Sequence, residues 1–476
     1  MKSFKFLAVF LLSQSLFFAA FAESKDDDTT EQKIEASFSG GSNVHIGQIH
    51  KAYAPEEFEG GNILHSTKFL TKKVMTSWDI NFNLELEFNE RMKVFAGAGG
   101  AVSFDLHAGP TEFIGSQGPG INKARGGFFG IYNTYLKYDL GNIENPPLSL
   151  HAGYFPYIYS QNSKTFGNYM YRTQLYPCLI YEGFPSVLGI RASSTLFESL
   201  KQDIIFSSET EKYPFFDFSL TYIASYTIFN TFEIGVGGSL WRILPIQESF
   251  TTPFSDKSRR EKKLTEWALT TDSTTRANIE KYFYIEDGDT TYYTFAGQKL
   301  MARFNFDPKG FIKSDIFGEN DLELYGEAIL LGIKNDTRYY KEIRERIPVM
   351  IGFNFPTFKL LDVLAVEFEY YEWPHSTSIQ DIDWAGYPVP SDIVESFGLI
   401  GTPEKVESLK RKYKEHDNFK FAVHAHRSIG KHLGIGCKFA RDHTRLPDWN
   451  GNPEWEENFA LPEHWYYLFT MSYSFK

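Results

Sequence analysis

Apolar and polar residues alternate without a break over residues 78–88. Every second position is apolar, and the positions between them, from Asp79 to Glu87, all carry carboxylates or amides. A period of two is typical of a β-strand, since successive side chains point to opposite faces. The segment is therefore predicted to be a strand with one apolar and one polar face. Its length is about that of a tilted strand that crosses a bilayer, roughly 9–11 residues.

The same alternation recurs along almost the whole chain. Further alternating runs cover residues 92–98, 128–140, 148–154, 188–196, 200–206, 216–226, 232–240, 292–306, 322–330, 347–355, 364–370, 419–425, 433–439 and 465–475. Together they predict about fifteen strands from Trp78 onward. One more strand, from within residues 33–50, completes an even number. The segments IEASFSG and NVHIGQI are alternative candidates for it.

The connections between the predicted strands alternate between short and long. The short ones cover residues 89–91, 141–147, 197–199, 227–231, 307–319, 356–360 and 428–431. The long ones cover residues 39–75, 108–127, 156–186, 243–291, 372–418 and 443–464, with two shorter members near Glu211 and Asp336. Transmembrane barrels have this asymmetry, with tight periplasmic turns and long extracellular loops. The predicted fold class is therefore all-β, a transmembrane antiparallel up-and-down β-barrel of about 16 strands.

The first 22 residues have a different character. Lys2 and Lys5 precede two apolar stretches, which end in the small-x-small sequence Ala20, Phe21, Ala22. This arrangement predicts a secretory signal peptide over residues 1–22. An acidic N-terminal segment, residues 23–32, then precedes the barrel, residues 33–476.

Composition and charge exclude some classes of function and membrane topology. The formal net charge is -12, and it becomes -14 without residues 1–22, which hold two lysines and no acidic residue. An acidic balance argues against a nucleic-acid partner. Aromatic residues make up 17% of the chain, yet nothing after the N-terminus offers the roughly 18 consecutive apolar residues of a spanning helix.

With its signal peptide, its loop parity and its terminal segment WYYLFTMSYSFK, the chain resembles Gram-negative outer-membrane porins of about 16 strands. One departure is Lys476, which follows Phe475 where the family commonly ends on the aromatic residue itself. The resemblance implies a barrel in the cell outer membrane, in contact with the lipid bilayer and lipopolysaccharide, and folded by the barrel-assembly machinery. It also implies a possible homotrimer, with no cofactor and no enzymatic activity.

The resemblance directs attention to the third outer loop, which typically folds inward as a constriction in porins of this size. Counting from the first predicted strand, this loop is residues 157–185. Its candidate constriction residues are Tyr169, Tyr171, Arg172, Tyr176, Tyr181 and Glu182. In the functional interpretation, Arg172 and Glu182 face the pore and the tyrosines form a stacking surface. In the alternative, the loop packs against the inner wall or the rim, because loops bury many tyrosines for structural reasons.

Alternation also assigns charges to the lumen. The acidic set is Asp79, Glu85, Glu87, Asp105, Asp139, Asp203, Asp217, Glu233, Glu323, Glu327, Glu367, Glu369 and Asp442. The basic set is Lys93, Lys137, Arg191, Lys201, Lys299, Arg303, Lys420 and Lys438. Thirteen against eight predicts a mild cation preference, although pairing across the lumen is the alternative for most individual residues. The candidate lumen-wall residues are Asp79, Glu85, Arg191, Asp217, Glu323, Glu327 and Glu367.

Aromatic residues at the predicted strand ends, among them Trp78, Tyr154, Tyr292 and Phe475, predict girdles at the membrane interfaces. Over residues 128–140, alternation places Tyr132 on the same outward face as Leu136 and Tyr138.

Signals for catalysis are weak, and no catalytic residue or metal site is predicted. His424 and His426 share a strand face, but they would hold a metal only with a third ligand. The leading hypothesis is a water-filled porin for passive diffusion of small hydrophilic solutes, with sugars or oligosaccharides suggested only by the aromatic content. The alternatives are an adhesin or receptor with a plugged lumen, and a barrel hydrolase. Ser428 beside His426 does not suit a hydrolase, because it falls in a short turn.

Overall fold

The computed structural model describes sixteen stretches of the chain. They are residues 34–50, 74–105, 124–142, 146–171, 186–197, 199–210, 216–244, 246, 257–272, 283–286, 289–292, 297–312, 314–333, 343–371, 418–442 and 465–475. The chain divides into two compact units, residues 1–35 and 36–476, and the second unit contains nearly all of the described residues. Over these stretches, no helix combines the length and the apolar character needed to cross a membrane.

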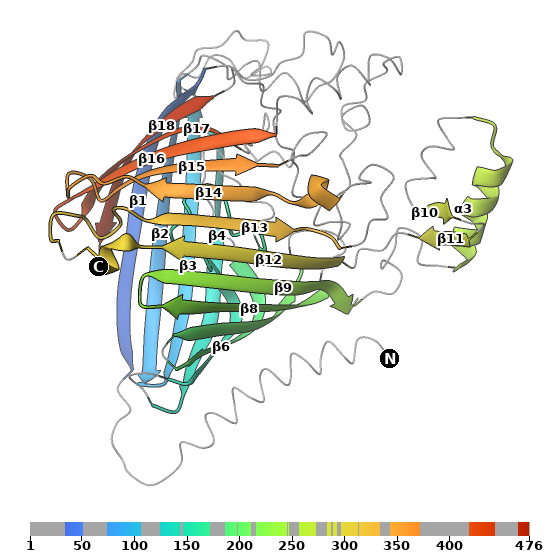
Figure 1. Cartoon of the computed structure of the whole chain (residues 1–476), viewed down its shortest axis with the longest axis horizontal. Helices are drawn as coiled ribbons and strands as arrows, with labels where there is room; N and C mark the ends of the chain where they lie inside the picture. Colours follow the sequence, from blue (N-terminus) through green and yellow to red (C-terminus); the bar gives the residue numbers. More distant parts are fainter. Residues whose placement is uncertain are drawn as a thin grey trace. The chain divides into compact units, whose positions relative to one another are not determined.

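Sixteen strands form a closed barrel (Figure 1). They are β1 (Glu35–Ile49), β2 (Val74–Asn89), β3 (Met92–Asp105), β4 (Ala124–Leu140), β5 (Leu148–Pro156), β6 (Ser186–Leu196), β7 (Leu200–Ser208), β8 (Phe218–Ile228), β9 (Phe232–Leu244), β12 (Gly297–Phe306), β13 (Leu324–Leu330), β14 (Val349–Asn354), β15 (Val363–Tyr370), β16 (Phe419–Ile429), β17 (Leu433–Arg441) and β18 (Tyr466–Phe475). Outside the barrel sheet lie α3 (Lys257–Leu269), the strands β10 (Phe283–Glu286) and β11 (Asp289–Tyr292), and two 3₁₀ turns, η4 (Pro308–Gly310) and η5 (Ile343–Arg346).

Each barrel strand pairs with its neighbours along the chain, and β9 pairs with β12 because β10 and β11 form a sheet of their own. The ring closes where β1 pairs with β18, in a register that runs from Gly40 opposite Phe475 to Ile49 opposite Tyr466. Closure gives every strand two hydrogen-bonded neighbours, so the sheet has no open edge. The predicted 16-stranded antiparallel barrel is confirmed. Both segments proposed for the first strand belong to β1, apart from Ile34, which precedes it.

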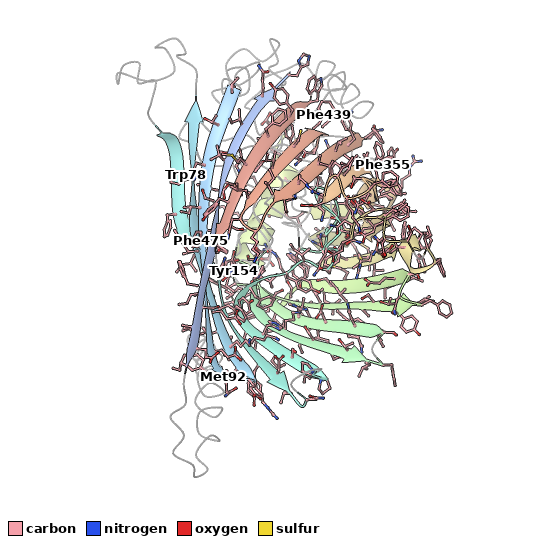
Figure 2. The ribbon with its side chains drawn as sticks, turned by 90° about the vertical axis from the view of Figure 1, so that its left-hand side faces the viewer. Trp78, Met92, Tyr154, Phe355, Phe439 and Phe475 are labelled. Carbon is pink, nitrogen blue, oxygen red and sulfur yellow. The ribbon has the colours of Figure 1, made fainter. Side chains whose placement is uncertain are left out.

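The two faces of the wall differ as the alternation predicts. Outward side chains are apolar and exposed, for example Trp78 at 44% and Ile204 at 51%. Inward side chains next to them in sequence are polar or covered, such as Ser77 and Ile205. Figure 2 shows side chains on both faces of the strands, with Trp78 among the labelled aromatic residues of the wall. An apolar outer face and a partly polar inner face are typical of a barrel in a bilayer.

Two of the described short connections contain successive residues with positive φ, whereas the connection from β12 to β13 is longer and contains the 3₁₀ turn η4. Phe229 and Asn230 join β8 to β9 with φ angles of 52° and 54°, and Phe358 and Lys359 have φ angles of 54° and 65° between β14 and β15. Two successive residues with positive φ make turns whose twist matches that of the flanking strands. Before β3, the side chain of Asn89 accepts hydrogen bonds from two backbone N–H groups.

The prediction that Tyr132 lies on the outward face is wrong, because β4 contains a β-bulge. The register of β3 and β4 pairs Gly97 with Asn133 but Ala98 with Ile131, so Tyr132 is the extra residue. The bulge exchanges the two faces of the strand on its N-terminal side. Ile131 is therefore exposed outward, at 69%, and the Tyr132 hydroxyl instead donates to the Asn83 side chain at 2.6 Å.

A second correction concerns the strand predicted over residues 292–306. The barrel strand β12 begins at Gly297. Tyr292 ends β11, where it pairs with Phe283 in the separate two-stranded sheet. Tyr292 is therefore not a girdle residue of the barrel wall.

Candidate functional site

Residues 157–171, the described part of the third long connection, lie against the inner wall of the barrel, and Glu367 holds one end of this segment. The Glu367 side chain projects inward from β15, since its neighbour Phe368 is exposed on the outer face. Its carboxylate accepts hydrogen bonds from the backbone N–H groups of Lys164, Thr165 and Phe166, at 2.5, 2.7 and 3.0 Å. A carboxylate with several N–H donors is a strong, charge-assisted anchor.

Glu327, on β13, holds the next part of the same segment. Its carboxylate accepts the backbone N–H groups of Asn168 at 2.7 Å and Tyr169 at 3.1 Å, and the Tyr159 hydroxyl at 2.6 Å. Gly167 lies between the two anchored stretches with φ at +81°, a conformation that glycine adopts without strain. The turn at Gly167 thus separates the N–H groups held by Glu367 from those held by Glu327.

The tyrosines of this segment are covered. Tyr169 is 0% exposed and its hydroxyl donates to Glu369, while Tyr171 is 9% exposed and packs edge-on against Tyr157. Burial and the nearby Glu327 carboxylate raise the pKa of Tyr159 well above its ordinary value. In the described part of the loop, these contacts are those of packing against the inner wall rather than of an open stacking surface.

Four of the six predicted constriction residues, Arg172, Tyr176, Tyr181 and Glu182, lie outside the described residues. Their assignment to the constriction stays a prediction.

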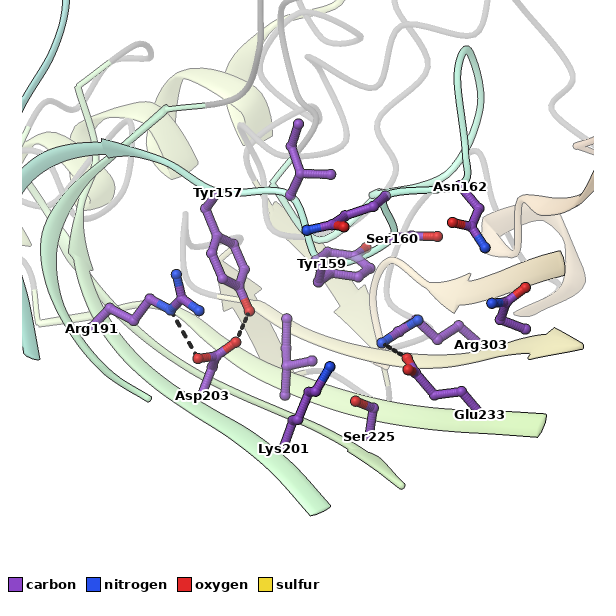
Figure 3. A pocket seen from close by; sticks show the side chains of 14 residues that line it. Tyr157, Tyr159, Ser160, Asn162, Arg191, Lys201, Asp203, Ser225, Glu233 and Arg303 are labelled. Carbon is purple, nitrogen blue, oxygen red and sulfur yellow. Dashed lines mark hydrogen bonds and ion pairs between the residues drawn. The ribbon is translucent and has the colours of Figure 1, made fainter. Parts of the chain in front are cut away.

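A cavity of about 240 Å³ lies between the loop segment and the wall (Figure 3). The loop contributes residues 157–162. The wall contributes Arg191, Lys201, Asp203, Ile223, Ser225, Glu233, Arg303 and Asn305, from β6, β7, β8, β9 and β12. Most of this lining is hydroxyl, amide or charged, so the cavity suits water and hydrophilic solutes.

Two ion pairs are fixed in the lining. Arg191 donates to Asp203 at 2.8 Å, and the Tyr157 hydroxyl donates to the same carboxylate at 2.8 Å. Across the cavity, Arg303 pairs with Glu233. The dashed contacts in Figure 3 show both pairs lying along the wall below the loop segment.

The other predicted lumen-wall residues have partners outside this cavity. Asp79 contacts His45 at 2.7 Å, Glu85 contacts Lys93 at 3.2 Å, and Asp217 lies 3.9 Å from Arg242. Glu323 lies 3.8 Å from Lys309 and accepts from the Asn354 amide at 3.3 Å. Of the seven candidates, the structure places Arg191 in the cavity and uses Glu327 and Glu367 as loop anchors.

Glu323 yields a pH-dependent prediction. Burial raises its pKa from 4.5 to about 7, against the opposing effect of Lys309. Because the folded-state pKa is the higher one, the carboxyl favours folding while protonated, and this contribution is lost as the pH rises from about 4.5 through about 7. We expect Glu323→Gln to match the wild type at about pH 4 and to exceed its unfolding free energy at about pH 8, by up to about 3 kcal/mol.

Urea unfolding of the refolded barrel at both pH values measures this difference. Glu85→Gln is the control, because Glu85 is a more exposed carboxylate with its own lysine partner. If Glu323→Gln changes the unfolding free energy by the same amount at both pH values, the raised pKa of Glu323 in the folded state is contradicted.

Comparison with known proteins finds similarity only among solved structures. The chain matches no protein-family model and no curated protein. Among solved structures it is similar to a triple mutant of the Rhodopseudomonas blastica porin, with 6% sequence identity and a TM-score of 0.39 over 93% of this chain and 100% of that chain. It is also similar to Salmonella typhi OmpF in complex with daunomycin, with 9% identity and a TM-score of 0.44 over 93% and 98%. The strand pairing of the chain itself gives a closed antiparallel barrel of 16 strands.

Proposed function

We propose that the chain is an outer-membrane porin, a water-filled channel for the passive diffusion of small hydrophilic solutes. The observation that carries the proposal is a loop segment anchored to the inner wall that leaves a polar cavity between itself and the opposite strands. A barrel of 16 strands is wide enough for an aqueous channel, and a loop folded into the lumen narrows it. Such a channel works by diffusion and requires neither a cofactor nor a catalytic residue.

The solute class rests on the cavity lining. Neutral polyols such as sugars can exchange hydrogen bonds with the hydroxyl and amide groups of Ser160, Gln161, Asn162 and Ser225. Stacking on Tyr169 or Tyr171 does not support sugar binding, because both side chains are buried. The cation preference expected from the whole wall is a separate matter, since the cavity itself has three basic and two acidic side chains.

The proposed partners follow from the proposed location. The exposed apolar outer face would contact the bilayer, and the long connections would face lipopolysaccharide. The last strand, β18, carries Tyr467, Phe469, Met471 and Tyr473 on alternate positions, which supports recognition by the barrel-assembly machinery. A homotrimer is proposed by analogy with porins.

Single-channel recording tests the proposed function. The refolded mature chain, added to a planar bilayer in KCl, is expected to give stable open steps, because a barrel of 16 strands is wide enough for an aqueous channel. Added maltooligosaccharides should lower the open current if sugars enter the cavity. Correctly folded barrels that give no steps would overturn the porin proposal and favour a plugged adhesin or receptor.

A further inference from the structure

The charge of the cavity is not balanced by its own ion pairs. The lining contains three cations, Arg191, Lys201 and Arg303, and two carboxylates, Asp203 and Glu233. Asp203 is fully engaged, since it accepts from Arg191 at 2.8 Å, from Ser193 at 2.6 Å and from Tyr157 at 2.8 Å. Glu233 is paired with Arg303. Both carboxylates are therefore already neutralised by arginines, and Lys201 is the cation that is left.

The register of the barrel explains why Lys201 has no carboxylate beside it. Its direct cross-strand neighbours are Thr195 on β6 and Ser225 on β8, both neutral hydroxyl residues. Long side chains can also pair with diagonal neighbours, and the diagonal positions in the paired register, Ser193 on β6 and Ile223 on β8, are uncharged as well. Within the part of the chain that the structure describes, Lys201 forms no ion pair, and its side chain is exposed. In Figure 3 its amine lies between the two ion pairs and points toward the loop.

We propose that this cavity is a subsite for the oxyanion group of a small solute, a phosphate or a carboxylate, with the Lys201 ammonium as its principal cation. The proposal rests on the proposed channel function and adds its substrate class. An exposed ammonium has three donors, and Ser225 and Ser160 place hydroxyl donors in the same lining. The fixed pairs of Arg191 and Arg303 keep the two carboxylates from competing for Lys201.

The cavity and the whole wall thus give opposite expectations for the ion selectivity of the channel. The thirteen acidic and eight basic residues predicted to face the lumen favour cations over its length. The described cavity, at the level of the loop, has a net excess of one positive charge. Selectivity in a channel depends on the groups that narrow it, because there the charge is closest to the passing ion. If the channel is narrowed at this cavity, the local excess of positive charge at Lys201 gives it an anion preference, which the experiment below tests.

The test uses the refolded full mature chain in planar bilayers. In a KCl gradient, the reversal potential of the wild type is expected to show an anion preference, and inorganic phosphate is expected to reduce the chloride current. Lys201→Gln should weaken phosphate block by about fivefold, the effect of one ion pair at about 4 Å in water. Lys201→Glu should reverse the preference to cations, and Lys201→Arg should restore anion preference.

Lys93→Gln is the matched control. It removes one lumen lysine that is paired with Glu85 and Glu87 outside the cavity, so it should leave phosphate block unchanged. Open steps with a cation preference in the wild type, or equal block in wild type and Lys201→Gln, would overturn the subsite while leaving the channel standing. If no steps appear, the channel proposal fails. Phosphorus NMR of phosphate with folded wild-type and Lys201→Gln barrels then decides the subsite. The phosphate signal should broaden with the wild type and stay sharp with Lys201→Gln.

Discussion

Glu367→Ala is expected to release residues 164–166 from the inner wall. The substitution leaves the backbone N–H groups of Lys164, Thr165 and Phe166 without their acceptor, and the last two residues are 0% exposed. Each unsatisfied buried donor costs roughly 1–3 kcal/mol, which destabilises the wall-bound conformation of residues 164–166, while Glu327 still holds Asn168 and Tyr169. We expect faster hydrogen exchange of these three amides and open channel currents that fluctuate between several levels.

Hydrogen exchange of residues 157–171 by mass spectrometry measures the first effect, and single-channel recording measures the second. Glu85→Ala is the matched control, because it removes a lumen carboxylate that contacts Lys93 and not the loop. Glu367→Gln should lie between the wild type and Glu367→Ala, since the amide keeps one acceptor oxygen. Unchanged protection of the three amides in Glu367→Ala would show that packing alone holds the segment.

The barrel could be predicted from the sequence because lipid and lumen impose the same two-residue period on every strand. The run over residues 78–88 shows this constraint without interruption, and the alternation of short and long connections gives the direction of each strand. The same reasoning fails where one residue is inserted. In the sequence, nothing at Tyr132 itself marks a bulge. The space for its ring is provided by Gly97 and Gly99, which lie on the facing strand.

The charged residues of the cavity could be assigned to the lumen, but their contacts could not be predicted. Alternation places Lys201, Asp203, Glu233 and Arg303 on inward faces. Which of them pair depends on the stagger between strands that lie far apart in sequence, such as β9 and β12, and this stagger follows from closure of the ring. This stagger cannot be read from the spacing of residues along the sequence.

The loop anchors show a different limit. Glu327 and Glu367 were predicted as lumen-wall charges, yet their described partners are mostly backbone N–H groups. Any residue except proline supplies such a donor, so the loop sequence gives no sign of the contact. The glycine at position 167 is the one local signal, because a left-handed residue between two anchored stretches favours glycine.

Gly352→Ala is expected to destabilise the barrel and to weaken the Glu367 anchor at the same time. Gly352 lies directly opposite Tyr325 in the register of β13 and β14, and the tyrosine ring covers it. A Cβ at position 352 would lie 2.2 and 2.4 Å from two ring carbons of Tyr325, a side chain that is 1% exposed. The buried ring must therefore move, and overpacking of this kind typically costs about 1–3 kcal/mol.

The Tyr325 ring links Gly352 to the loop segment. The Tyr325 hydroxyl donates to Glu367 at 2.8 Å, beside the N–H groups of the loop segment. Moving the ring removes this donor from the anchoring carboxylate, so we expect a lower unfolding free energy in urea and faster exchange of the Thr165 and Phe166 amides. Tyr325→Phe separates the two effects, because it removes the hydroxyl and leaves the ring over Gly352.

Gly238→Ala is the control for adding a methyl group to a barrel strand. Its Cβ would meet Leu300 at 3.5 Å and the Lys299 carbonyl at 3.7 Å, which are ordinary contacts. It should therefore unfold within about 0.5 kcal/mol of the wild type. Equal stability of Gly352→Ala and Gly238→Ala would contradict the close packing of Tyr325. If Gly352→Ala is less stable but the loop amides stay protected, the backbone donors alone hold Glu367, and the tyrosine supports the strand pair rather than the loop.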